Sequence, residues 1–236
     1  MTKIFGIMSA PLGLVISQLY NIIGNYGITL IVITIVIKIL LYPLYKKQIM
    51  SMASMGDLQP LMKDIQNKYA NDPVLMREKT AELYQEHGVN PMGGCLPMAI
   101  QMIVIMGLFG LLRNPLMFIK SDKMIFAIHE SFLWIKDLSQ PDLWVLPIMA
   151  GVATFFAFYI QNKVGTPGTQ MAGGGMQKTM MFVFPLMIVW LARSYPAGLA
   201  IYWFMSQFIQ IFYNIRFAKL KKEMRNKKKF KKSNRK

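Results

Sequence analysis

One apolar stretch near the N-terminus, Gly27 to Leu44, constrains the fold more than any other segment of the chain. Its 18 residues are about as many as an α-helix needs to cross a bilayer, and Lys38 is the only charged residue among them. A lysine at membrane depth costs at least about 2.5–3.5 kcal/mol, so it usually faces the protein interior or water. Snorkelling to the interface marked by Lys46 and Lys47 would require a reach of about 12 Å. We therefore expect Lys38 to face a groove within the protein, with snorkelling as the alternative.

Four further apolar segments follow in a chain that is 54% hydrophobic. They are Leu96–Leu112, Leu143–Ile160, Gln177–Ala192 and Ala197–Phe217. With the first stretch they predict five membrane-spanning helices, which leave the two termini on opposite sides. Twenty of the 27 Lys and Arg residues then fall on the side of the C-terminus and six on the other side. The positive-inside rule therefore predicts an N-out/C-in topology.

The expected fold is an all-α polytopic membrane protein with five regions. Residues 1–26 carry apolar side chains on one helical face and polar ones on the other, which predicts an amphipathic helix in the outer interface. Residues 27–45 form the first span, and residues 46–93 form a cytoplasmic helical hairpin. Residues 94–217 contain spans two to five, and residues 218–236 form a basic cytoplasmic tail.

An apolar stripe runs along the first helix of the predicted hairpin at spacings of three and four residues. Its members are Met55, Leu58, Met62, Ile65 and Tyr69. Asp72 suits the N-cap of the second helix, Pro73 its first position and Gly88 its C-terminal end. Because so small a hairpin cannot bury all of its own surface, we expect the stripe to contact a partner or lipid, and a simple spacer is the alternative.

The basic tail carries eleven Lys and Arg residues and one acidic residue between positions 219 and 236. Such a segment next to a membrane attracts anionic lipid, and it also attracts ribosomal RNA by releasing counterions. The candidate contact residues are Lys227, Lys228, Lys229, Lys231 and Lys232. A solvated tail that only sets the topology is the alternative interpretation.

Residues suited to catalysis are sparse in this sequence. His87 and His129 fall on opposite sides of the membrane in the predicted topology, and no spacing typical of a metal site, a nucleophile or a phosphate loop occurs. Cys95 is the only cysteine, which excludes an intramolecular disulfide. We therefore expect a protein that is not an enzyme and that uses no cofactor or metal.

Polar residues are scattered through the predicted spans, and a buried lysine without a countercharge needs water or polar neighbours. The candidates to line a groove with Lys38 are Thr34, Gln101, Gln161, Ser206, Gln207, Gln210 and Asn214. Thr34 lies four residues before Lys38 and so shares its helical face. Ser206, Gln207 and Gln210 cannot all point in one direction, so we expect at least one of them to pack against a neighbouring helix.

Four separated segments resemble the YidC family of membrane protein insertases, which includes the mitochondrial oxidase-assembly and chloroplast Albino proteins. They are Lys38–Leu44, Leu58–Pro60, Asn90–Pro97 followed by Ile100 and Gln101, and Tyr195–Leu199 with Tyr202 and Trp203. The resemblance covers the chain from about Pro11 to the basic tail. The family commonly has arginine at position 38, proline at the position of Ile103 and glutamine at that of Phe158.

The resemblance implies an insertase and folding chaperone in the bacterial inner membrane, acting alone or beside the Sec translocon. It implies a hydrophilic groove that includes Trp203 and draws in the polar flank of a client, which is a nascent membrane protein. The stripe residues Met55, Leu58 and Met62 are then candidates for client or partner contact. Lysine at position 38 keeps the positive charge but loses bidentate pairing with a carboxylate. The alternative function is a non-inserting assembly scaffold or a small-solute channel.

Overall fold

The computed structural model describes residues 2–89, 96–113, 117, 122–163 and 173–233. Its helices are α1 (Thr2–Ile23), α2 (Tyr26–Asp57), α3 (Gln59–Lys68), α4 (Pro73–Glu86), α5 (Leu96–Arg113), α7 (Asp122–Ala127), α8 (Val145–Lys163), α9 (Gly173–Ala192) and α10 (Ala197–Ser233). Within these residues the only β-type pairing is an isolated bridge between Phe132 and Ile135. The prediction of an all-α fold is confirmed.

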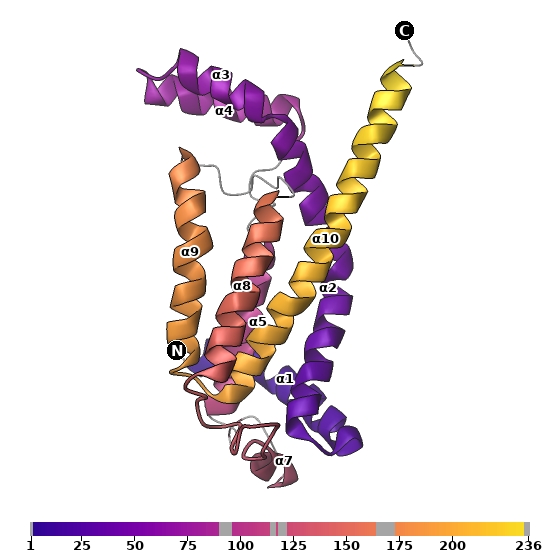
Figure 1. The fold of residues 1–236 in the computed structure, drawn as a ribbon, viewed down its shortest axis with the longest axis vertical. Coiled ribbons are helices and arrows are strands. Elements are labelled where there is room, and N and C mark those ends of the chain that lie inside the picture. Colours follow the sequence, from indigo (N-terminus) through magenta and orange to yellow (C-terminus); the bar gives the residue numbers. More distant parts are fainter. Residues whose placement is uncertain (1, 90–95, 114–116, 118–121, 164–172, 234–236) are drawn as a thin grey trace.

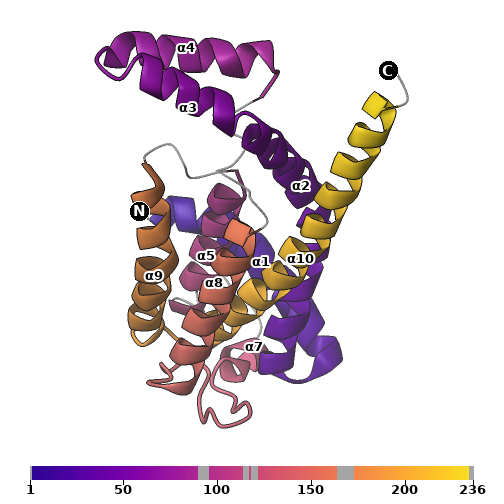
Figure 2. The ribbon, with the colours of Figure 1, turned by 45° about the horizontal axis from the view of Figure 1, so that its top comes forward.

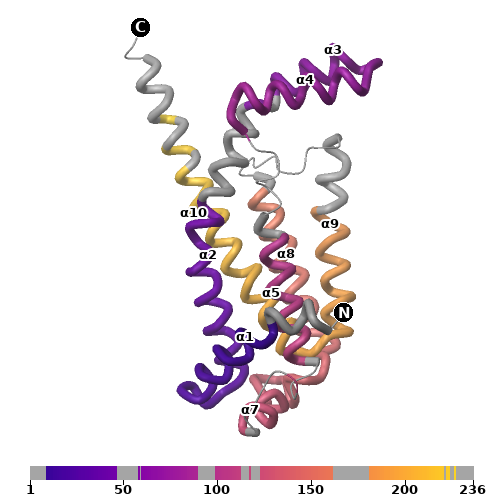
Figure 3. The backbone as a smooth tube through the Cα atoms, turned by 180° about the vertical axis from the view of Figure 1, so that it is seen from behind, coloured from indigo at the N-terminus to yellow at the C-terminus, as the bar shows by residue number. Residues whose placement is uncertain are grey.

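Helices α2, α5, α8, α9 and α10 form an elongated bundle (Figure 1). α10 packs along both α8 and α2, and α9 packs mainly against α8. α1 crosses one end of the bundle, where it packs against α5 and α2 (Figure 3). α10 therefore joins the two sides of the bundle.

The two ends of the bundle differ in construction. The α3–α4 pair and the C-terminal end of α10 project from one end, which we call the hairpin end (Figures 1 and 2). α7 and the loop 128–144 lie at the opposite end, which we call the loop end. The predicted hairpin and tail thus lie at the same end of the molecule.

Length and composition support one membrane span among the residues that the structure describes, Tyr26–Lys46. Shorter apolar helical segments are Ser9–Ile23, Ala99–Leu112, Val145–Gln161 and Met181–Ala192. The prediction of five spans therefore goes beyond what helix length alone supports.

The α3–α4 hairpin begins later than the sequence suggested, because α2 continues without a break to Asp57. The break falls at Leu58 because Pro60, in the first turn of α3, has no N–H with which to continue α2. The predicted second helix is confirmed. The Asp72 carboxylate accepts hydrogen bonds from the backbone N–H groups of Val74 and Leu75, and Gly88 ends the hairpin with a φ of 61°.

α1 packs against the bundle with part of its predicted apolar face. Ile16 is completely buried, and Leu12 and Leu19 pack against the same apolar core. Ile22, near the C-terminal end of α1, is 83% exposed, because α1 crosses the bundle and only part of its apolar face meets α5 and α2. α1 therefore packs on the bundle with part of its apolar face, and its position in the outer interface stays a prediction.

Several features singled out in the sequence lie outside the described residues. They include Asn90–Cys95 and the side chains of Met55, Lys227, Lys228, Lys229, Lys231 and Lys232. The backbone of the basic tail belongs to α10 as far as Ser233. The boundary expected at residue 218 therefore does not coincide with a helix end.

Candidate functional site

The buried residues of α2 are mostly apolar near the loop end, apart from Thr29, whose hydroxyl donates to the backbone oxygen of Asn25, and they become polar further along the helix. Tyr26, Leu30 and Ile33, near the loop end, belong to the main apolar core. Thr34 and Lys38 come next, and they are buried too. A polar region therefore begins about halfway between the loop end and the hairpin end.

α10 runs in the same direction as α2, from the loop end to the hairpin end, and shows the same change. Its first turns, Ala197 to Tyr202, belong to the apolar core at the loop end. Ser206 and Asn214, further along, are buried polar residues. The buried or half-buried polar residues of this region whose side chains hydrogen-bond to another helix are here called the polar cluster, and they are Lys38, Gln101, Thr154, Ser206, Gln210 and Asn214. They come from four helices, which only the folded bundle brings together.

Lys38 is 4% exposed, and its amine has neutral neighbours. Its Nζ lies 3.4 Å from Gln210 Oε1 and 3.5 Å from the Tyr45 hydroxyl, to both of which it donates. Nζ also lies 5.0 Å from the centre of the Tyr45 ring. Among the described residues no carboxylate forms an ion pair with Lys38. The amine is therefore held in the protein interior without a countercharge.

Gln210 and Asn214 extend this network across α10 to α8. Gln210 Nε2 donates to Asn214 Oδ1 at 3.1 Å, and Asn214 Nδ2 donates to the backbone oxygen of Ala157 at 3.0 Å. The Tyr213 hydroxyl donates to the backbone oxygen of Lys38 at 3.0 Å. These bonds fix α10 between α2 and α8 at the level of the lysine.

A second group of hydrogen bonds lies nearer the apolar core. Gln101 Nε2 donates to the Tyr202 hydroxyl at 3.0 Å, and Ser206 Oγ donates to Gln101 Oε1 at 3.2 Å. Trp203 Nε1 donates to Thr154 Oγ1 at 3.0 Å. Three of the sequence candidates, Gln101, Trp203 and Ser206, are thus engaged around α10.

The other candidates are placed differently. Thr34 is completely buried and donates to the backbone oxygen of Leu30 at 2.6 Å, so its hydroxyl is satisfied within α2. Ser206 and Gln210 are four residues apart and share a face of α10, and Gln207, three residues before Gln210, is half-buried. Gln161 is half-buried near the hairpin end of α8. That at least one of the three polar side chains of α10 packs against a neighbouring helix instead of lining the groove stays a prediction.

Two residues of this region, Tyr45 and Thr154, were not predicted from the sequence. Tyr45 follows Lys38 by seven residues, a spacing that returns to the same helical face after two turns. Thr154 is buried between Ala150 and Ala157, at spacings of four and three residues. Both spacings can be seen in the sequence, but neither indicates which helix packs against that face of α2 or α8.

The apolar stripe of α3 packs inside the hairpin. Leu58 is 5% exposed and clusters with Leu83 and Tyr84 of the second helix, with Met62 against them. The Tyr84 hydroxyl donates to Met62 Sδ at 3.2 Å. We expected the hairpin to be too small to cover its own stripe. This is wrong for Leu58, because α4 covers the Leu58 side chain. A partner contact by Leu58 would require the hairpin to open.

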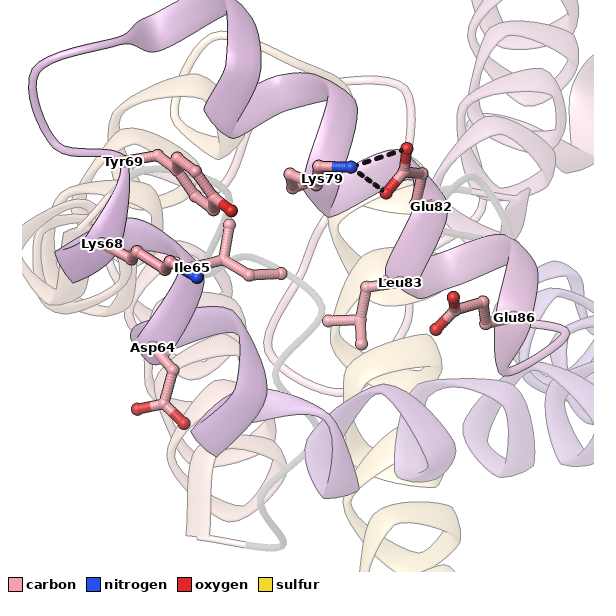
Figure 4. A pocket seen from close by; sticks show the side chains of 8 residues that line it. All are labelled: Asp64, Ile65, Lys68, Tyr69, Lys79, Glu82, Leu83 and Glu86. Atoms are coloured by element: carbon pink, nitrogen blue, oxygen red, sulfur yellow. Dashed lines mark hydrogen bonds and ion pairs between the residues drawn. The ribbon is translucent and has the colours of Figure 1, made fainter.

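A pocket of about 260 Å³ lies between α3 and α4 (Figure 4). Its lining residues are Asp64, Ile65, Lys68, Tyr69, Lys79, Glu82, Leu83 and Glu86. Lys79 and Glu82 already pair within it, at 2.7 Å. An exposed pair of this kind contributes little stability and leaves the pocket without a dominant charge. The buried Lys38 region is therefore the stronger candidate site.

Residues 18–226 match the protein family described as "60Kd inner membrane protein". The chain is 39% identical to the membrane protein insertase YidC of Fusobacterium nucleatum over 212 residues, which cover 89% of this chain and 95% of that protein. It is 34% identical to the YidC of Caldanaerobacter subterraneus over 85% of this chain and 88% of that protein. The YidC of Syntrophus aciditrophicus is longer, and a match of 38% identity covers 35% of it.

The fold is similar to a solved structure as well. A crystal structure described as an active YidC insertase with its first transmembrane domain resolved matches with a TM-score of 0.63 and 27% identity. The match covers 86% of this chain and 44% of the other. Sequence and fold agree, and the chain belongs to the YidC family of membrane protein insertases.

Proposed function

We propose that this chain inserts nascent membrane proteins into the bilayer and helps them to fold, with the polar cluster as the site that receives a polar client flank. A polar segment crossing hydrocarbon exposes unsatisfied groups at several kcal/mol each. Buried polar side chains offer such a segment hydrogen-bond partners on its way. These hydrogen bonds lower the free energy of the client's path into the bilayer and involve no covalent step. The chain therefore needs no catalytic residues for insertion.

The observation that carries the proposal is the buried Lys38 amine, which has no carboxylate partner in the part of the chain that the structure describes. A charge held this way favours an acidic group that comes from outside the protein. The apolar core at the loop end supports a site that is closed on that side, because the first turns of α2 and α10 pack into that core. Access is then from the hairpin end or from the lipid.

The proposed arrangement is a multi-pass protein of the bacterial inner membrane with five spans and the N-out/C-in topology. The hairpin end then faces the cytoplasm, where the α3–α4 hairpin and the tail meet clients and partners. α10 carries the basic tail in the same direction, within reach of anionic lipid or the ribosome. The Sec translocon is the proposed partner for larger clients.

Insertion into liposomes tests the proposal. The purified protein would be reconstituted, and protease-protected insertion would be measured for a single-span client with an acidic outside tail. We expect wild type and Lys38→Arg to insert this client and Lys38→Gln to insert it several-fold less, because glutamine keeps polarity but not charge. Empty liposomes provide the baseline.

Three results would contradict the proposal in whole or in part. Wild-type insertion no better than that of empty liposomes, with a correctly folded protein, would favour an assembly scaffold. Full insertion by Lys38→Gln would keep the insertase but remove Lys38 from its site. Passage of ions in the absence of any client would instead favour the channel.

A further inference from the structure

An aromatic group lies directly between Lys38 and the hairpin end. We call it the aromatic cap, and it consists of Tyr42 and Tyr45 of α2 and Tyr213 and Phe217 of α10. The ring centre of Tyr42 lies 5.3 Å from that of Tyr213 and 5.8 Å from that of Phe217. Tyr45 and Phe217 are buried, so the cap closes the contact between α2 and α10 on this side of the lysine.

Tyr45 is the member of the cap that touches the amine. Its ring centre lies 5.0 Å from Lys38 Nζ and its hydroxyl 3.5 Å from the same atom. Tyr45 is 5% exposed, whereas Lys46, the next residue, is exposed. Solvent at the hairpin end therefore reaches the helix beside Tyr45 but not the charge beneath it.

The contacts of the amine are long for a charged donor. Hydrogen bonds from an ammonium group to a carboxylate have lengths of about 2.7–2.9 Å and are roughly twice as strong as neutral ones. Both contacts of Lys38 Nζ, to Tyr45 and Gln210, exceed this range. A carboxylate is therefore a better partner than the phenol, whereas a neutral amide or hydroxyl is no better than what Tyr45 and Gln210 already provide.

We propose that Tyr45 is a specificity-determining residue, which covers the Lys38 amine and gives way to a client carboxylate but not to a neutral polar segment. The inference rests on the proposed insertase function. Displacement requires only that the Tyr45 side chain change rotamer, which leaves α2 in place. Tyr45 thereby makes entry depend on an acidic group in the client flank.

The cover itself can be tested without any client. The protein in bilayer nanodiscs would be treated with a water-soluble amine-acylating reagent, and mass spectrometry would compare labelling of Lys38 with that of exposed Lys46. We expect Tyr45→Ala to raise this ratio about three- to tenfold, the range that corresponds to loss of one cation–π contact. Tyr45→Phe keeps the ring and should stay close to wild type, as should Tyr42→Ala, which removes a ring that does not touch the amine.

Selection is tested with two clients that differ only in acidic or amide side chains in the outside tail. We expect wild type and Tyr45→Phe to insert the acidic client preferentially. Tyr45→Ala should lower the acidic-to-neutral ratio about three- to tenfold, because water and neutral groups then reach Lys38. Tyr45→Leu, which retains apolar bulk, repeats the test if the alanine variant is unstable.

Each outcome decides the proposal. Unchanged Lys38 labelling in both Tyr45→Ala and Tyr45→Leu would show that the ring is not the cover. Increased labelling with an unchanged client ratio would overturn the role in selection. If Tyr42→Ala lost client selection as strongly as Tyr45→Ala, the selection would belong to the whole aromatic cap and not to Tyr45. A wild type that inserts neither client would overturn the proposed function and the selection with it, while labelling would still decide whether Tyr45 covers Lys38.

Discussion

The partners of individual side chains decide what this molecule can bind and how its helices meet. Lys38 has Gln210 and Tyr45 beside it rather than an acid, which leaves its charge available to a ligand. At the loop end, the packing of the helices depends on a residue without a side chain, Gly27. Gly27 lies so close to Phe132 that an added Cβ would come within 2.3 Å of the ring. The contact lets loop 128–144 lie directly on the first turn of α2.

Gly27→Ala should destabilise the protein by about 1–3 kcal/mol, the usual range for overpacking. The overlap involves the base of the Phe132 ring as well as its edge, so a rotamer change alone does not relieve it. Thermal unfolding in detergent measures the effect. In a double-mutant cycle, Phe132→Ala should remove part of the loss caused by Gly27→Ala. Strictly additive losses would argue against this contact.

At the scale of elements, loop 128–144 supplies hydrogen-bond acceptors to the starts of three helices. Glu130 accepts from the backbone N–H of Tyr26 at the start of α2 and from the Tyr20 hydroxyl of α1. The backbone oxygens of Gln140 and Leu138 accept from the first two N–H groups of α10. Asp142 accepts from three consecutive N–H groups where α8 begins. A short loop thus satisfies donors that helix starts leave free.

Asp142→Ala should cost about 0.5–2 kcal/mol, as expected for loss of an N-cap, and Asp142→Asn should cost less. The indole N–H of Trp134 also donates to this carboxylate, at 2.9 Å. Unfolding midpoints of the two variants and wild type would be compared at neutral pH. Equal midpoints for alanine and wild type would show that Asp142 contributes no capping.

The stability due to Asp142 should depend on pH. Burial alone would raise the pKa of its carboxyl, but the hydrogen bonds from Trp134 and the backbone outweigh burial and lower the pKa below its usual value. The ionised group therefore stabilises the fold above the unfolded-state pKa, about 3.9. This contribution is lost as pH falls through the lowered folded-state pKa. The difference in midpoint between wild type and Asp142→Ala should thus be full at pH 7 and shrink below about pH 4. A constant difference at acidic pH would contradict this.

At the scale of the whole molecule, the apolar core and the polar cluster divide the bundle into two parts. The core lies towards the loop end, where α7 and loop 128–144 add to it, and the aromatic cap lies towards the hairpin end. Such an arrangement resists opening at the loop end more than at the hairpin end, because more apolar surface is buried there. Client entry from the hairpin end then leaves the folded core intact.

The two ends should lie on opposite sides of the membrane. In a Cys95→Ser background, Lys136→Cys probes the loop end and Glu86→Cys probes the hairpin, since both native residues are exposed. We expect a membrane-impermeant maleimide to label Lys136→Cys in right-side-out vesicles and Glu86→Cys in inverted ones. Detergent-permeabilised vesicles, in which both should react, are the control. Labelling of both positions from one side would contradict the proposed topology.

What the sequence determined by itself was local. The apolar segments, the break at Pro73, the cap at Asp72 and the position of Lys38 in a helix depend on neighbours within a few residues. Hydrogen bonding and hydrophobic burial along a helix act over that range, so the sequence was sufficient to predict them. The resemblance to the family could also be recognised from the sequence, because the family's motifs are contiguous stretches of chain.

What only the tertiary structure decided was which surfaces meet. Lys38 and Gln210 are 172 positions apart, and nothing local to either indicates their contact. Leu58 was expected at the surface but is covered by α4, and Tyr45 was overlooked but covers Lys38. In each case the outcome depends on the packing of two helices against each other. A periodic sequence indicates that a face will be buried, but the element that buries it is chosen by the free energy of the whole bundle.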